Sequence, residues 1–192
     1  MFEASASRYN AGMRLALKLH PDSLGSAVTR VEAEALRGGA GNLVLSYFVT
    51  GRISELRLPP HAAATRTDEL WQHTCFEAFI RRSTGPEYYE FNFSPSLQWA
   101  AYRFNTYRDG MCIATDISAP RIETQSDSEH CVLHASLALD HANLPGDGPL
   151  RLGLSAIIEE SSGRKSYWAL AHPSGKPDFH HPDCFACELL QT

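Results

Sequence analysis

The chain is built from short segments in which apolar and polar residues alternate, and this alternation limits the fold more than any other feature. In Met13–His20, apolar side chains occupy every second position, so one side of the segment is apolar. A period of two is typical of a β-strand with one buried face. Further strand-like segments, set off by turn-forming residues, span 28–36, 43–50, 53–58, 75–81, 88–94, 98–107, 130–139, 149–158, 166–171 and 187–190.

About ten strands at such short spacing predict an all-β, antiparallel sandwich or barrel. The segment 28–36 also has the glutamate and alanine content of a helix, but the glycine-rich turn that follows it favours a strand. We expect a short helical turn over 139–145. We also expect a mobile polar loop over 119–129, where few apolar residues could anchor the chain.

Length and composition exclude several classes of protein. The chain has 192 residues, and we expect one domain over 1–192. A formal net charge of -5 argues against a protein that binds the phosphate backbone of nucleic acids. No stretch approaches the roughly eighteen apolar residues of a membrane span. The first ten residues do not resemble a secretory signal, and the odd number of five cysteines fits a reducing compartment. We therefore expect a cytoplasmic protein without nucleic-acid or membrane partners.

Polar residues in three neighbouring segments predict a ligand-binding face. Alternation places Glu77 on one side of a binding strand that we expect within Leu70–Ile80, and Glu90 and Asn92 on one side of theirs. Trp99 and Arg103 share a side of the next strand. Carboxylates, an amide, an arginine and an aromatic plane are what a polar ligand such as a sugar needs. Two other interpretations stay open: a solvated face with an ion pair to Arg103, and a carboxylate pair that hydrolyses glycosides.

The C-terminal part of the chain is rich in histidine, aspartate and cysteine. His180-His181 and Cys184-x-x-Cys187 suggest zinc, but only one of the two arms has a spacing typical of a structural zinc site. Three prolines and a glycine predict a long loop over one end or face of the sheet. His172, Asp178 and His180 could contact a ligand from this loop, or they could cap its turns. We predict no metal site and no catalytic cysteine.

Three blocks of the sequence resemble a known family. They are "ELWQHTCFEAFI", "YYEFNFSPSLQWAAYRFNTYRDGM" and "YWALAHPSGKPDFHHPDCFACEL", which together span about Glu69 to Leu189. They are similar to the DOMON-like domains, a bacterial group related to family 9 carbohydrate-binding modules. The resemblance implies a jelly-roll-like β-sandwich with one ligand site and no catalysis. Ligands in the wider group are sugars or haem.

The resemblance also suggests roles for individual residues. Sugar-binding relatives clamp the sugar with tryptophans, and Trp71, Trp99 and Trp168 all lie in the matching blocks. Each of them could equally be a core residue. Haem-binding relatives use methionine and histidine ligands, for which this chain offers Met111, His172, His180 and His181.

We therefore predict a non-catalytic domain that binds a small molecule, a carbohydrate or sugar derivative, with no cofactor. The alternatives are a hydrolase or isomerase acting on a sugar derivative, and a haem-binding or protein-interaction domain. Trp99→Ala and Arg103→Ala are expected to abolish binding and to leave folding intact. The predicted ligand-binding residues are Trp71, Glu77, Glu90, Asn92, Trp99, Arg103, Trp168, His172, Asp178 and His180.

Overall fold

The computed structural model describes residues 14–23, 27–39, 41–139, 144 and 148–190. Within these residues it contains strands and three short 3-10 helices, and none of the helices is long and apolar enough to cross a membrane. The strands are β1 (Leu15–Leu19), β2 (Val28–Arg37), β3 (Asn42–Gly51), β4 (Cys75–Arg82), β5 (Tyr88–Phe93), β6 (Trp99–Phe104), β7 (Cys112–Ile113), β8 (Arg121–Ser126), β9 (His130–Ala138), β10 (Leu150–Glu159), β11 (Lys165–Ala169) and β12 (Cys187–Leu189). The 3-10 helices are η1 (Ile53–Glu55), η2 (Leu70–Gln72) and η3 (Pro182–Cys184).

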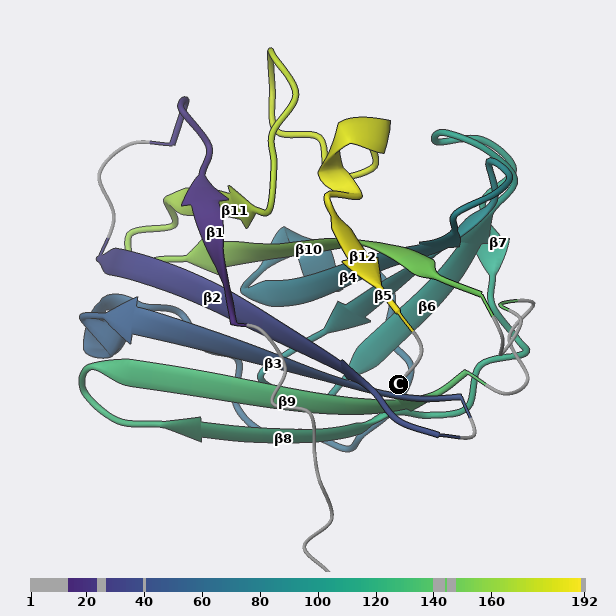
Figure 1. The fold of residues 1–192 in the computed structure, drawn as a ribbon. Coiled ribbons are helices and arrows are strands. Elements are labelled where there is room, and N and C mark those ends of the chain that lie inside the picture. Colours follow the sequence, from purple (N-terminus) through teal and green to yellow (C-terminus); the bar gives the residue numbers. More distant parts are fainter. Residues whose placement is uncertain (1–13, 24–26, 40, 140–143, 145–147, 191–192) are drawn as a thin grey trace, which may run out of the picture.

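The strands form an antiparallel sheet that curls into two layers, as Figure 1 shows. One layer has the order β2-β3-β9-β8, and the other has the order β7-β6-β5-β4-β10-β11. Strand β1 connects the layers because it pairs with β2 on one side and with β11 on the other. The predicted all-β antiparallel sandwich is confirmed, and the narrower jelly-roll topology stays a prediction.

The main core lies between the two layers and comes from alternate residues of the strands. Tyr47, Phe76, Phe91 and Phe93 have no exposed surface, and the Tyr47 hydroxyl donates a hydrogen bond of 2.6 Å to the Glu77 carbonyl across the layers. Burial of the Tyr47 ring stabilises the fold, and the hydrogen bond removes the free-energy cost of an unpaired buried hydroxyl.

A second apolar cluster covers the outer face of the β4–β6 and β10–β11 layer. Phe79, Tyr88, Tyr102 and Phe104 belong to it, together with Phe179 and Phe185 of the C-terminal segment. This segment, 171–186, lies over the outer side of β10 in Figure 1. Strand β5 is therefore buried on both faces, and all six of its residues are buried. A polar residue on the outer face of this layer is thus inside the protein, which is what makes a site there possible.

Local predictions from the sequence were right for most strands and wrong at three places. Residues 28–36 form a strand, as we expected. Residues 53–58 were predicted as a strand but begin with the 3-10 helix η1, whose turn is closed by a bond from Leu56 N to the Ile53 carbonyl. Leu70–Gln72, the start of the expected strand Leu70–Ile80, is also a 3-10 helix. The predicted loop 119–129 contains β8, a polar edge strand paired with β9. The turn expected over 139–145 lies largely outside the described residues.

Candidate functional site

A cavity of about 860 Å³ opens on the outer face of the β4–β6 and β10–β11 layer. Its size is in the range of small-molecule sites in proteins. The wall combines ring surfaces with ionisable groups, and the C-terminal segment closes one side. The aromatic lining residues are Trp71, Phe79, Tyr102, Phe104, Tyr167 and Phe179. The ionisable lining residues include Asp68, Glu69, Glu77, Glu90, Arg108, Lys165 and His180.

Two buried carboxyl groups, those of Glu77 and Glu90, lie in the wall of this cavity. Glu77 is opposite Asn92 on β5, and Glu90 is opposite Phe79 on β4, so the two glutamates are diagonal neighbours on adjacent strands. Their exposed fractions are 3% and 7%. The Ser155 hydroxyl donates to Glu77 Oε2 at 3.2 Å, and Asn92 Nδ2 donates to Glu90 Oε1 at 2.7 Å. Only neutral donors therefore bond to the pair among the described residues.

Burial in the cavity wall makes ionisation of the two carboxyls unfavourable. Desolvation, and then the nearby charge of Glu90, raise the pKa of Glu77 to about 8. Desolvation also raises the pKa of Glu90, against the opposing effect of the Asn92 hydrogen bond. At neutral pH the pair therefore retains at least one proton, and it can donate as well as accept hydrogen bonds.

His180 connects the C-terminal segment to strand β5. Its Nδ1 lies 2.8 Å from the Tyr88 hydroxyl, and its Nε2 lies 3.6 Å from Glu90 Oε2. Desolvation, followed by the charge of Arg108, lowers the pKa of His180 to about 4. The imidazole is therefore neutral at physiological pH and does not neutralise Glu90.

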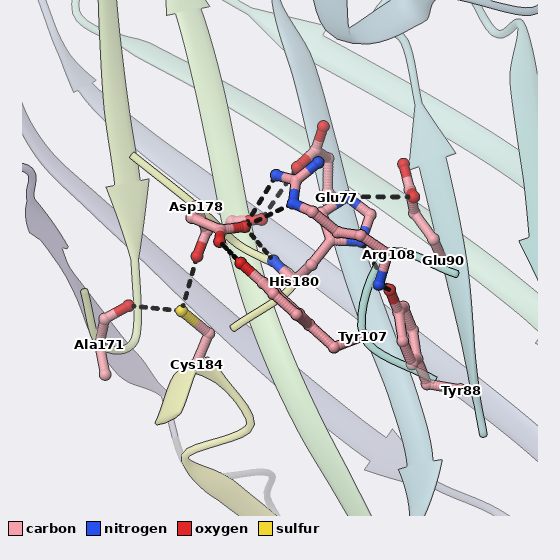
Figure 2. Close-up of polar contacts among 10 residues, drawn as sticks. Glu77, Tyr88, Glu90, Tyr107, Arg108, Ala171, Asp178, His180 and Cys184 are labelled. Carbon is pink, nitrogen blue, oxygen red and sulfur yellow. Dashed lines mark hydrogen bonds and ion pairs between the residues drawn. The ribbon is translucent and has the colours of Figure 1, made fainter. Parts of the chain in front are cut away.

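Arg108 and Asp178 join the loop after β6 to the C-terminal segment, as Figure 2 shows. The Arg108 side chain donates to Asp178 Oδ1 through its Nη2 at 2.7 Å and its Nε at 3.2 Å. The Tyr107 hydroxyl donates to the other oxygen of the same carboxylate. Arg108 has a left-handed backbone, with φ of 53°, and its N–H donates to the Tyr88 hydroxyl at 3.2 Å. These contacts hold two chain segments at the edge of the cavity, 70 residues apart in sequence.

The C-terminal segment lies very close to strand β10 at Gly153. A Cβ atom at Gly153 would be 3.0 Å from the Cys184 carbonyl oxygen, closer than almost all real contacts of this kind. The Cys184 thiol donates to the carbonyl oxygens of Ala171 and Asp178, each at 3.2 Å. Glycine at this position therefore allows the segment to approach the sheet and to form one wall of the cavity.

Replacing Gly153 by valine is expected to lower the free energy of unfolding by about 1 to 3 kcal/mol, because the added methyl groups must displace the backbone at Cys184. Urea denaturation of the variant and the wild type measures this difference. The matched control is Gly39→Ala, since a Cβ at Gly39 would meet no atom within 4 Å. Equal stability of the Gly153 variant and the wild type would contradict the close approach.

The structure brings together part of the predicted set of ligand-binding residues. Trp71, Glu77, Glu90 and His180 line the cavity. Asn92 lies behind them, fully buried and bonded to Glu90. The contribution of each to binding stays a prediction.

Four other predicted residues do not line the cavity, and the expected common face with the glutamates was wrong for Trp99 and Arg103. Trp99 and Arg103 pair with Phe93 and Tyr89, which point to the face of the layer opposite Glu77 and Glu90. Trp168 is buried in the main core, with its Nε1 bonded to Ser166. His172 does not line the cavity, and its Nε2 is 2.8 Å from the Lys18 carbonyl oxygen.

Asp178 has an intermediate position among the predicted residues. It lies beside the cavity, where it holds Arg108 and borders a separate shallow hollow with Tyr107. Its carboxylate therefore holds the Arg108 side chain in place, and its contribution to binding stays a prediction.

Sequence reasoning missed several residues of the cavity wall. Tyr102 pairs with Glu90, and Phe104 pairs with Tyr88, so both share the face of the carboxyl pair. Alternation identified Tyr102 and Phe104 as one face of β6 but could not show which face of β5 it matched. The Tyr102 hydroxyl donates to Asp68 Oδ1 at 2.7 Å, which fixes an acidic residue of an irregular segment at the cavity wall.

The structure gives little support to a metal or a haem group in this part of the protein. Among the described residues, no group of three or more histidine, cysteine, aspartate or glutamate side chains is placed to hold a metal ion. Met111 and His180 both line the cavity, but Tyr88 and Glu90 face the two ring nitrogens of His180. A histidine with both nitrogens facing partners does not fit the role of an axial ligand.

The fold and the cavity define a β-sandwich protein with a ligand-sized hollow on the outer face of one layer. No family model matches the sequence, and no curated protein sequence matches it significantly. Solved structures do show a similar fold. A proposed carbohydrate-binding protein from Bacteroides uniformis ATCC 8492 has a TM-score of 0.66 and 12% identity, over 90% of this chain and 83% of that one.

Two structures of a family 9 carbohydrate-binding module from Caldicellulosiruptor kristjanssonii are also similar. The complex with cellotriose has a TM-score of 0.55 and 13% identity, over 90% of this chain and 79% of the module. The complex with glucose has a TM-score of 0.56 and 11% identity, over 100% of this chain and 91% of the module. At such low identity the comparison establishes a shared fold, and the predicted resemblance to DOMON-like domains stays a prediction.

Proposed function

We propose that this protein binds a carbohydrate in the cavity described above and does not catalyse a reaction. The observation that carries the proposal is the convergence of ring surfaces with a buried carboxyl pair in one cavity of about 860 Å³. Aromatic planes cover the apolar faces of a sugar ring, and fixed polar groups bond to its hydroxyls. The shared fold with modules solved in complex with cellotriose and glucose supports the same ligand class.

Trp71 is the residue best placed to cover one face of a bound sugar. It lies on η2, lines the cavity and leaves 49% of its surface exposed, a large fraction for a tryptophan. Exposed tryptophan surface at a cavity mouth has no role in the core, so its contribution is expected to appear only when a ligand is bound.

A titration followed by thermal unfolding tests the proposal directly. A sugar at a hundred times its dissociation constant is expected to stabilise the protein by about 2.7 kcal/mol, which is roughly 5 to 10 °C for a domain of this size. Trp71→Ala is expected to remove this shift while changing the unfolding temperature without ligand by less than about 2 °C. The control is Leu190→Ala, an exposed apolar side chain that does not line the cavity. Flat titrations with mono- and oligosaccharides would contradict the proposal.

One observation favours a second candidate, the hydrolysis of a glycoside. A carboxyl pair that retains one proton at neutral pH offers an acid and a base, as Glu77 and Glu90 do. Incubation with nitrophenyl glycosides, followed by the absorbance of nitrophenol, distinguishes the two functions. Release of nitrophenol that Glu77→Gln abolishes would establish the enzyme in place of the binding protein.

A further inference from the structure

The carboxyl pair in the cavity has no cationic partner of its own in the part of the chain that the structure describes. Among the described residues, no lysine, arginine or N-terminus forms an ion pair with Glu77 or Glu90. Glu159, another buried glutamate, does have basic side chains as partners. Glu159, on β10, is 4% exposed and is bonded to Arg57 at 3.0 Å and to His73 at 2.8 Å. Buried carboxylates are normally paired in this way, because an isolated buried charge is costly.

The basic side chains that line the cavity do not neutralise the pair. Arg108 lies close enough to influence both carboxyls, but its guanidinium bonds to Asp178. His180 faces Glu90 in its neutral form. Lys165 lines the cavity on β11 and makes no ion pair with either carboxyl in the described part of the chain.

The remaining titratable groups around the pair add no positive charge. Burial raises the pKa of the Cys75 thiol and of the Tyr88 and Tyr102 hydroxyls, so these groups stay neutral. Asp68 and Glu69 add further carboxyl groups to the lining. The cavity is therefore acidic, with its buried carboxyls on neighbouring strands and rings around them.

We propose that the preferred ligand is a sugar that carries a protonated primary amine, whose ammonium group lies between the carboxyls of Glu77 and Glu90. This inference rests on the proposed function and specifies its ligand class. A neutral sugar hydroxyl can form a hydrogen bond with a carboxyl in either protonation state. Ionisation of both Glu77 and Glu90 therefore adds little to its binding free energy. An ammonium group has three donors and one positive charge, so it supplies the partner that the pair lacks.

Binding of an ammonium group changes the protonation of the carboxyl pair, whereas binding of a neutral sugar does not. The unliganded pair holds a proton at neutral pH, and the incoming ammonium group favours the ionised form of both carboxyls. Binding therefore releases a proton from the pair to the buffer. The heat of binding then depends on the ionisation enthalpy of the buffer, and the affinity rises with pH until the amine of the ligand itself loses its charge.

Isothermal titration calorimetry at pH 7 in phosphate, HEPES and Tris tests both points. The probes are D-glucose, its 2-amino, 3-amino and 6-amino deoxy analogues, and N-acetyl-D-glucosamine, which lacks the charge. At least one amino analogue is expected to bind ten-fold or more tightly than glucose and N-acetylglucosamine, with an enthalpy that varies between buffers. The double variant Glu77→Gln, Glu90→Gln is expected to bring this ratio close to one. Glu159→Gln is the control for a buried carboxyl outside the cavity and is expected to keep the ratio.

The outcomes separate this inference from the proposed function. Glucose and all the amino analogues binding with similar affinity and buffer-independent heats would overturn the ammonium site and leave carbohydrate binding established. Preferential binding of N-acetylglucosamine would overturn it as well, because acetylation removes the positive charge. If no probe binds to the wild type, the ammonium site is overturned, and the thermal titrations with mono- and oligosaccharides decide carbohydrate binding separately.

Discussion

Replacing Trp99 by alanine is expected to lower the free energy of unfolding by about 3 to 5 kcal/mol, the usual cost of removing a large aromatic side chain from a core. Trp99 is 5% exposed and packs in the main core between the two layers. The Arg66 guanidinium also lies 4.3 Å from the centre of the Trp99 ring. The Nη1 and Nη2 atoms of Arg66 donate hydrogen bonds to the carbonyls of Ala101 and Ala114. Removal of the indole would therefore leave a cavity and loosen a segment that this arginine holds.

Guanidinium denaturation of the variant measures the loss, and for a chain of this length the midpoint of thermal unfolding should fall by roughly 6 to 20 °C. The matched control is Trp71→Ala, the same substitution at a tryptophan that is 49% exposed. Its cost is expected to stay within about 0.5 kcal/mol. A loss below about 1 kcal/mol at Trp99 would place its side chain outside the core. The expected loss of about 3 to 5 kcal/mol would correct the sequence-based expectation that Trp99→Ala leaves folding intact.

The stability of the wild-type protein is expected to fall as the pH rises from about 6.5 to 8, and Glu77→Gln is expected to remove most of this fall. The folded pKa of Glu77 is raised to about 8, so the native state keeps a proton that the unfolded chain releases near its ordinary pKa. The stabilising contribution is complete at low pH and is lost as the pH rises through about 8. Between pH 6.5 and 8 the loss amounts to about 1.5 kcal/mol.

The window above pH 6.5 avoids an opposite contribution from His180. Its folded pKa is lowered to about 4, so it makes the protein less stable as the pH falls from its ordinary value of about 6.5. Urea denaturation at several pH values in this window measures the slope for each variant. Glu159→Gln removes a buried carboxyl with ion-pair partners and should lower stability while keeping the slope. An unchanged slope in Glu77→Gln would show that Glu77 is ionised in the folded protein.

The sequence by itself determined the class of the fold and the chemistry available to the site. Alternation with period two and closely spaced turn residues were enough to predict an antiparallel β-sandwich, because side-chain direction along a strand is a local property. The same pattern placed Glu77 on the side of its strand opposite Phe76. It placed Glu90 and Asn92 together on the side of their strand opposite Phe91. They also marked the C-terminal residues 171–186 as a long loop above the sheet.

Only the tertiary structure decided which faces of neighbouring strands coincide. Within β6, alternation separates Trp99 and Arg103 from Tyr102 and Phe104, but the pairing register with β5 decides which group lies beside Glu90. A shift of one residue in that register would exchange the two groups. The charge of Arg103 favours its group for a polar face, but the register places Tyr102 opposite Glu90 instead.

The burial of the carboxyl pair was also decided by tertiary structure. The outer face of a two-layer sandwich is normally solvated, and a glutamate there would have an ordinary pKa. Here the C-terminal segment packs against β10, where Gly153 allows a backbone contact, and Arg108 bonds to Asp178 across 70 residues of sequence. These contacts depend on the folded positions of distant segments, which no local pattern encodes. Because of these contacts Glu77 and Glu90, which alternation alone would place on an exposed face, form a buried pair in a cavity.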